Sequence, residues 1–203
     1  MAMNTTLRFP TFAALIAVAS LAACSDEPRG TPESAASEPI PVNRAAAAPV
    51  DALEAAVAMG VFNAHEPVPG LLTAGQITEA QMDALVQAGF KTFVSLRLPT
   101  EEGAGWEEAY AAQRGIAFTR VPVGGAEGLT RANAEAVDQI LKAAGEGKTA
   151  LYCGSANRVG ALLALRAHWL EGAAPDQAMA LGRAAGMKSL EPEVAKLLAA
   201  GTP

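Results

Sequence analysis

One cysteine and one arginine, Cys153 and Arg158, stand where a protein could bind and attack an anion. A short apolar run over 149–152 leads into Cys153, and a long apolar helical pattern over 159–170 follows. We therefore predict that the cysteine lies on a turn between a strand and a helix. Such a turn directs backbone N–H groups inward beside the positive end of the helix, so it forms an anion cradle that also favours a thiolate.

The residues between the cysteine and the arginine are the predicted substrate-binding loop: Gly154, Ser155, Ala156 and Asn157. A nucleophilic sulfur inside an anion site suits attack on phosphorus or sulfur that carries negative oxygens. Ser155 and Asn157 either bind such an oxygen or shape the turn through local bonds to the backbone. The alternative without chemistry is that Cys153 is only a small buried apolar residue.

Residues 1–23 are predicted to be an export signal. Arg8 makes the start weakly basic, and the apolar stretch over 12–23 is too short to span a bilayer. This stretch ends at Cys24 in a sequence that resembles a bacterial lipobox, which implies lipid attachment to the sulfur of Cys24. Ser25 stands where an inner-membrane lipoprotein would have aspartate, so the resemblance implies a periplasm-facing domain anchored to the outer membrane. The alternative is an ordinary secretory signal with an incidental cysteine.

Composition divides the remainder into a flexible linker, 24–50, rich in Pro and Ala, and a folded domain, 51–203. The net charge is -6 and no basic run is present, which disfavours nucleic acid as a partner. The two histidines, His65 and His168, lie far apart and have no metal-ligand spacing, so we expect no metal. We also expect no cofactor and a monomeric domain that acts on a small anionic substrate.

Strands and helices alternate along the folded domain. We predict strands over 71–74, 91–97, 116–121 and 149–152, helices over 52–59, 79–88, 106–114, 131–144, 159–170, 175–185 and 191–199, and a mobile glycine-rich loop over 124–128. This alternation predicts the α/β class, with a mainly parallel central sheet flanked by helices. The site should lie at the carboxyl ends of the strands.

Several stretches resemble the bacterial phosphatase-like domain that occurs fused to β-lactamase-fold hydrolases, a branch of the cysteine-based phosphatases. They lie over 72–76, 88–97, 115–118 and 121–123 and around Cys153. The resemblance implies a protein-tyrosine-phosphatase-like fold and hydrolysis of a phosphomonoester through a phosphocysteine intermediate. It implies Cys153 as the nucleophile and Arg158 as the residue that binds the substrate oxygens.

The loop departs from the usual phosphatase pattern. Four residues rather than five separate Cys153 from Arg158, which removes one N–H donor. Tyr152 replaces the histidine that normally precedes the cysteine, and Val159 replaces the hydroxyl residue that normally follows the arginine. These changes weaken the case for efficient phosphate ester hydrolysis.

Two further residues are accessory candidates. No aspartate follows Pro122 to act as general acid, and Glu127 is the nearest substitute. Arg97 ends a predicted strand on the edge that carries the cysteine. It either adds positive charge to the pocket or pairs at the surface with Glu101 or Glu102.

The short loop also resembles that of rhodanese-type sulfurtransferases, in which a cysteine carries a persulfide. In that alternative Cys153 accepts a sulfane sulfur and Arg158 binds an anionic donor such as thiosulfate. A third reading is a non-catalytic scaffold that binds an anion. Of these three hypotheses, we favour the phosphatase by a narrow margin, because the resemblance to phosphatase-like domains covers residues 68–170.

Overall fold

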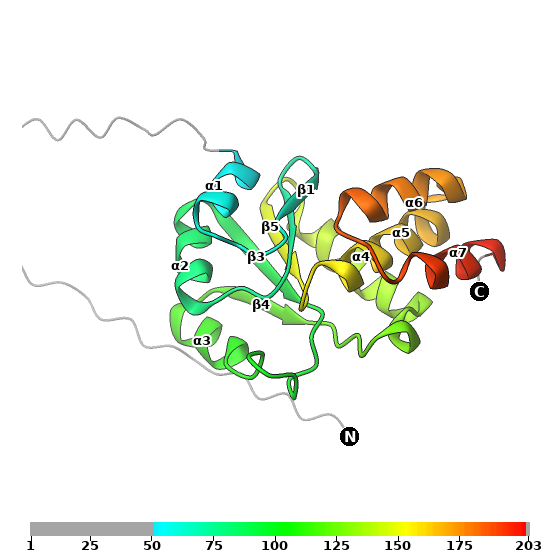
Figure 1. The fold of residues 1–203 in the computed structure, drawn as a ribbon. Helices are drawn as coiled ribbons and strands as arrows, with labels where there is room; N and C mark the ends of the chain where they lie inside the picture. Colours follow the sequence, from blue (N-terminus) through cyan, green and yellow to red (C-terminus); the bar gives the residue numbers. More distant parts are fainter. Residues whose placement is uncertain (1–50, 202–203) are drawn as a thin grey trace, which may run out of the picture. The chain divides into compact units, whose positions relative to one another are not determined.

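The computed structural model describes residues 51–201, which form one five-stranded sheet with helices on both faces (Figure 1). The strands are β1 (His65–Val68), β2 (Leu71–Ala74), β3 (Phe90–Ser95), β4 (Ala117–Arg120) and β5 (Lys148–Tyr152). Their order is β1-β2-β5-β3-β4; β1 is antiparallel to β2, and the other neighbours are parallel. The predicted mainly parallel sheet is confirmed. The predicted signal peptide, Cys24 and the linker over 24–50 lie outside the described residues.

The helices agree with the sequence prediction to within two residues at each end. They are α1 (Ala52–Ala58), α2 (Glu79–Gln87), α3 (Glu107–Arg114), α4 (Arg131–Ala144), α5 (Asn157–Glu171), α6 (Pro175–Ala184) and α7 (Glu191–Ala199). The start of α2 illustrates how local capping residues fix a helix boundary. Thr78 caps it through a hydrogen bond from the amide of Gln81, and the Gln81 side chain accepts from the amide of Thr78.

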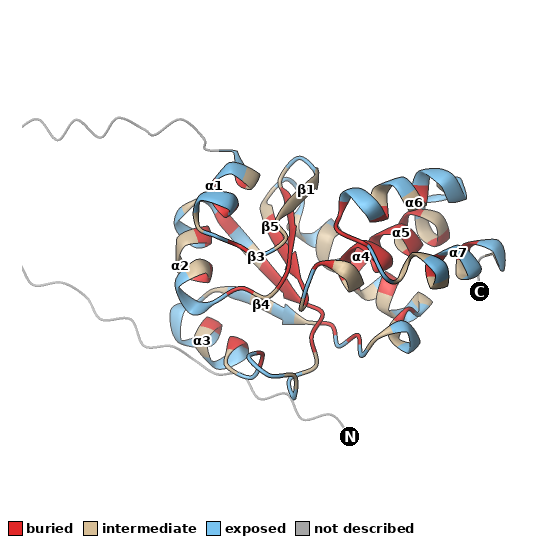
Figure 2. Cartoon of the chain, viewed as in Figure 1, coloured by how far each residue is buried: buried red, intermediate tan, exposed pale blue. Residues whose placement is uncertain are grey.

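Two apolar cores lie on opposite faces of the sheet. Helices α1, α2 and α3 cover one face, and α4 to α7 cover the other (Figures 1 and 2). Because successive side chains of a strand point to opposite faces, Leu151 and Cys153 enter the core beside α5, whereas Ala150 and Tyr152 enter the other. The residue that carries the predicted nucleophile is therefore fixed by packing on both sides.

Helix α5 is the buried central helix that the apolar pattern predicts. Alanine and leucine cover most of its circumference, and nine of its residues are buried. It approaches α6 so closely that a Cβ atom at Gly160 would lie 2.4 Å from the carbonyl oxygen of Gly182. The end of α5 next to Cys153 is thus held rigidly against the rest of the domain.

The structure corrects three details of the prediction. Strand β1 was not expected, because Pro67 and the partly exposed side chains of an edge strand give no apolar alternation. Strand β3 ends at Ser95, so Arg97 lies in the loop after it. The glycine-rich segment contains a 3-10 turn, η1 (Ala126–Gly128), which the burial of Leu129 anchors.

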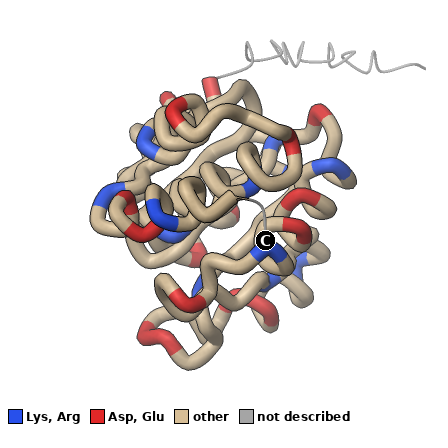
Figure 3. The backbone as a smooth tube through the Cα atoms, turned by 90° about the vertical axis from the view of Figure 1, so that its right-hand side faces the viewer, with Lys and Arg blue, Asp and Glu red and all other residues tan. Residues whose placement is uncertain are grey.

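Basic and acidic positions are interspersed along the backbone in the view of Figure 3. Many of them pair locally, as Arg183 does with Glu191. Within residues 51–201, no helix is long and apolar enough to cross a membrane.

Candidate active site

The site lies where three parallel strands end together. Strand β5 is central, and its last residue, Tyr152, lies beside Ala74 of β2 and Ser95 of β3. Because the three strands share this register, the residues that follow them meet at one edge of the sheet. Cys153 is the first residue after β5, and its amide donates to the carbonyl oxygen of Ala74 at 3.2 Å.

The turn after Cys153 leaves backbone donors open at the start of α5. No side chain caps this helix. Among the described residues, no atom accepts a hydrogen bond from the amides of Gly154, Ser155, Asn157 or Arg158. Ala156, the N-cap, has a left-handed backbone with φ of 65°, a conformation found in backbone nests that bind anions. These amides are therefore unpaired among residues 51–201, and Cys153, which precedes them, is 1% exposed and packs in the apolar core beside α5.

Two residues of the loop make contacts with distant parts of the chain. The Asn157 Oδ1 atom accepts from the amide of Lys188 at 2.7 Å, and its Nδ2 donates to Ser189 Oγ at 2.8 Å. Asn157 thus ties the cradle to the segment between α6 and α7. Ser155 is exposed, and its carbonyl oxygen accepts from Asn63 Nδ2 at 3.2 Å. For Asn157, shaping of the turn is the role that the contacts support.

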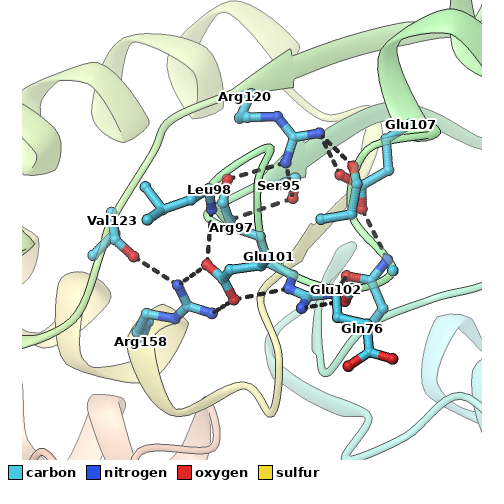
Figure 4. Close-up of polar contacts among 12 residues, drawn as sticks. Gln76, Ser95, Arg97, Leu98, Glu101, Glu102, Glu107, Arg120, Val123 and Arg158 are labelled. Carbon is cyan, nitrogen blue, oxygen red and sulfur yellow. Dashed lines mark hydrogen bonds and ion pairs between the residues drawn. The ribbon is translucent and has the colours of Figure 1, made fainter.

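Arg158 is held by a carboxylate that the sequence did not assign to it. Its Nη1 and Nη2 atoms donate to the two carboxylate oxygens of Glu101 at 2.6 and 2.8 Å, and Nη1 also donates to the carbonyl of Val123 at 2.7 Å (Figure 4). Glu101 is the main cause that raises the pKa of Arg158, and Cys153 adds to it. A guanidinium has five N–H groups, so Nε–H and one Nη2–H remain on the side opposite Val123.

Glu101 collects more than one donor. The pKa of Glu101 is lowered to about 2, chiefly by the hydrogen bonds from Arg158, with help from the amide of Leu98 and from Arg97. The Nε atom of Arg97 lies 3.0 Å from a Glu101 oxygen, and the Leu98 amide 2.8 Å from the other. Glu101 is therefore ionised at neutral pH and cannot be the acid that protonates a leaving group.

The two accessory candidates lie in different surroundings. Arg97 is only 8% exposed, and its guanidinium bonds Glu101, Gln76 and the carbonyl of Glu102. One alternative from the sequence was an ion pair between Arg97 and Glu101 at the surface. The structure contains this pair, but the Arg97 side chain is buried. Glu127 is exposed on η1, with a carboxylate folded toward Gly124 and Gly125. Among residues 51–201, no hydrogen bond or ion pair joins Glu127 to Cys153 or Arg158.

Sequence reasoning missed a second layer of polar residues behind the site. Glu107 is fully buried, and it accepts from Gln76 Nε2 at 2.9 Å and from Arg120 Nη2 at 2.6 Å. Arg120 also donates to the carbonyl of Arg97 at 3.0 Å. Glu107 occupies the first turn of an otherwise polar helix, α3, so no apolar pattern marked it as buried.

Tyr152, which stands where phosphatases usually have histidine, is fully buried in the core beneath α1, α2 and α3. Its hydroxyl makes no hydrogen bond within the described part of the chain. Burial, followed by the nearby negative charge of Glu107, raises the pKa of Tyr152. Tyr152 therefore stays neutral, and its side chain packs in the core on the face of the sheet opposite to Cys153.

Neither a family model nor a curated protein matches this chain. Solved structures do. A candidate phosphatase from Shewanella putrefaciens is 19% identical, with a TM-score of 0.54 over 71% of this chain and 97% of its own. A candidate phosphatase from Neisseria meningitidis is 22% identical, with a TM-score of 0.53 over 64% of this chain and 94% of its own.

A third similar structure is TpbA of Pseudomonas aeruginosa in complex with pTyr. It is 18% identical, with a TM-score of 0.50 over 66% of this chain and 82% of its own. Together these structures show that this chain has a protein-tyrosine-phosphatase-like fold. At such low identity the likeness establishes the fold and leaves the reaction to be argued from the site.

Proposed function

We propose that this protein is a cysteine-dependent phosphatase that hydrolyses phosphomonoesters. The observation that carries the proposal is the position of Arg158. Two of its N–H groups remain available after Glu101 and Val123 take the others, and they accompany unpaired amides of the loop beside Cys153. A tetrahedral oxyanion needs several such donors around a nucleophile.

In the proposed first step, the thiolate of Cys153 attacks phosphorus and the ester P–O bond breaks. The leaving alkoxide takes a proton from a general acid, for which Glu127 is the candidate in the chain, or from water. Water then attacks the phosphocysteine, the S–P bond breaks, and inorganic phosphate and the thiolate are released. Arg158 and the loop amides of Gly154 and Ser155 hold the phosphoryl oxygens throughout.

Aryl phosphates are the substrates of first choice, because their leaving groups need little protonation and so tolerate a weak general acid. The pTyr complex of TpbA, a protein of the same fold, supports this choice. The full chain should hydrolyse p-nitrophenyl phosphate, and quenched samples should carry a phosphoryl group on Cys153. Cys153→Ser should abolish both. A wild type without turnover between pH 5 and about 7.5, conditions in which such thiolates act, would contradict the proposal.

Sulfur transfer is the second candidate, favoured by the loop of four residues between Cys153 and Arg158. In that case, thiosulfate incubation should add one sulfur atom to the wild type and none to Cys153→Ser. A scaffold would fail in both assays. Tungstate would still raise its melting temperature, and Arg158→Ala would remove that increase.

We also propose that lipid on Cys24 anchors the domain to the outer membrane, facing the periplasm, with Ser25 directing the sorting. The lipobox resemblance supports this proposal. Labelled palmitate should enter the wild type and not Cys24→Ala, and the labelled protein should fractionate with outer membranes. A released, unlabelled wild type would instead indicate an ordinary secretory signal.

A further inference from the structure

Gln76 lies directly behind the candidate site, where strand β2 ends beside β5. The backbone N–H of Gln76 donates to the carbonyl oxygen of Gly154 in the loop, at 3.4 Å. The preceding residue, Gly75, forms a β-bridge with Ser155. The main chain of Gln76 therefore runs along the cradle, and its side chain starts within reach of the residues that hold Arg158.

The side-chain amide of Gln76 is bonded at both ends. Its Oε1 accepts from Arg97 Nη1 at 2.5 Å, and its Nε2 donates to Glu107 Oε1 and to the carbonyl of Ile77, both at 2.9 Å (Figure 4). An arginine can only donate and a carboxylate can only accept, so these two neighbours fix which way the amide faces. Gln76 is a neutral dipole between a buried anion and a buried cation.

From Gln76, a continuous series of bonds reaches Arg158. Arg97 donates to Glu101 at 3.0 Å, and Glu101 binds Arg158 through both oxygens. The side chains of Arg97, Glu101 and Arg158 are 10%, 26% and 14% exposed, so water competes weakly for these bonds. The orientation of Glu101 thus depends on Arg97, whose own Nη1 is held by the Gln76 oxygen.

We propose that Gln76 is a positioning residue for Arg158. It acts through Arg97 and Glu101 and keeps the remaining Nε–H and Nη2–H of Arg158 directed at the bound oxyanion. The inference rests on the proposed function and extends it, because it assigns a residue that orients Arg158 for binding the substrate oxyanion. It nevertheless concerns anion affinity, which can be measured even if no ester is hydrolysed.

The test measures tungstate affinity of the full chain by titration calorimetry. Gln76→Leu, which cannot bond Arg97, should weaken tungstate binding about tenfold, the effect expected for a hydrogen bond to a charged group. Gln81→Leu is the matched control: this glutamine also bonds backbone atoms, those of Met59, Gly60 and Thr78, away from the site. It should leave tungstate affinity unchanged.

A double-mutant cycle with Arg158→Lys separates positioning from general damage to the fold. Lysine keeps the charge but lacks the planar fork, so Gln76→Leu should cost almost nothing further in the Arg158→Lys background. Equal costs in both backgrounds, or a folded Gln76→Leu with wild-type affinity, would overturn the inference. If the wild type binds tungstate but hydrolyses no phosphate ester, the proposed function fails while this cycle still decides the role of Gln76.

Discussion

Glu101 and Arg158, which are 57 positions apart in the chain, form a two-pronged ion pair with N···O distances of 2.6 and 2.8 Å. This pair uses one edge of the guanidinium and leaves another edge free. The carboxylate therefore orients the arginine rather than occupying all of its donors.

The free edge of Arg158 should determine catalytic efficiency. Arg158→Lys removes the fork, so kcat/KM for p-nitrophenyl phosphate should fall about 10²–10³-fold, as when an oxyanion donor is lost. Arg183→Lys is the control, because within residues 51–201 the side chain of this exposed arginine pairs with Glu191 alone. It should retain full activity. A fall of less than about fivefold in Arg158→Lys would show that Arg158 does not grip the transition state.

Glu101 should make stability depend on acid pH. The pKa of Glu101 is about 2 in the folded protein, against an ordinary value of 4.5, so the folded state binds this proton more weakly than the unfolded state does. The resulting stabilisation is complete above pH 4.5 and is lost as pH falls from 4.5 toward about 2. Glu101→Gln should flatten that part of the unfolding free-energy curve.

Urea unfolding at a series of pH values measures this effect. Glu193→Gln, which removes an exposed partner of Lys196, is the control and should leave the wild-type slope nearly intact. Parallel acid curves for the wild type and Glu101→Gln would mean that Arg97 and Arg158 do not hold Glu101 in solution as they do in the structure.

The close crossing of α5 and α6 should tolerate no added methyl group. In Gly160→Ala the new Cβ would meet the carbonyl of Gly182 and the amide of Met187 at 2.4 Å, so we expect a loss of about 1–3 kcal/mol in unfolding free energy. Gly105→Ala is the control, since its Cβ would lie 3.5 Å from the nearest atom, a carbonyl oxygen. Thermal and urea unfolding should separate the two variants; equal stabilities would contradict the packing described here.

The buried hydroxyl of Tyr152 should contribute nothing to stability. It has no hydrogen-bond partner within residues 51–201, so Tyr152→Phe should be neutral or about 1 kcal/mol more stable. Tyr110→Phe is the contrast, because the Tyr110 hydroxyl donates to Asp83 at 2.8 Å. That variant should lose about 0.5–1.5 kcal/mol. A large loss in Tyr152→Phe would reveal a bond from the hydroxyl to Glu107.

Local patterns were sufficient to predict most of the fold. The capping pair Thr78 and Gln81 predicted the start of α2, and the apolar run after Arg158 predicted a buried α5. The position of Cys153 between a strand and a helix also followed from neighbours in the sequence. Strand β1 could not be predicted, because an edge strand with Pro67 has neither a continuous apolar run nor an alternation.

The sequence by itself determined which residues are chemically able to act: a thiol, a loop rich in small residues and a guanidinium, in that order. Only the tertiary structure decided their partners. The register of β2, β5 and β3 brings Gln76, Gly154 and Arg97 to one edge, and folding brings Glu101 to Arg158. These contacts depend on which strands are neighbours in the sheet. The spacing of residues along the chain does not reveal them, because long-range packing decides which strands pair.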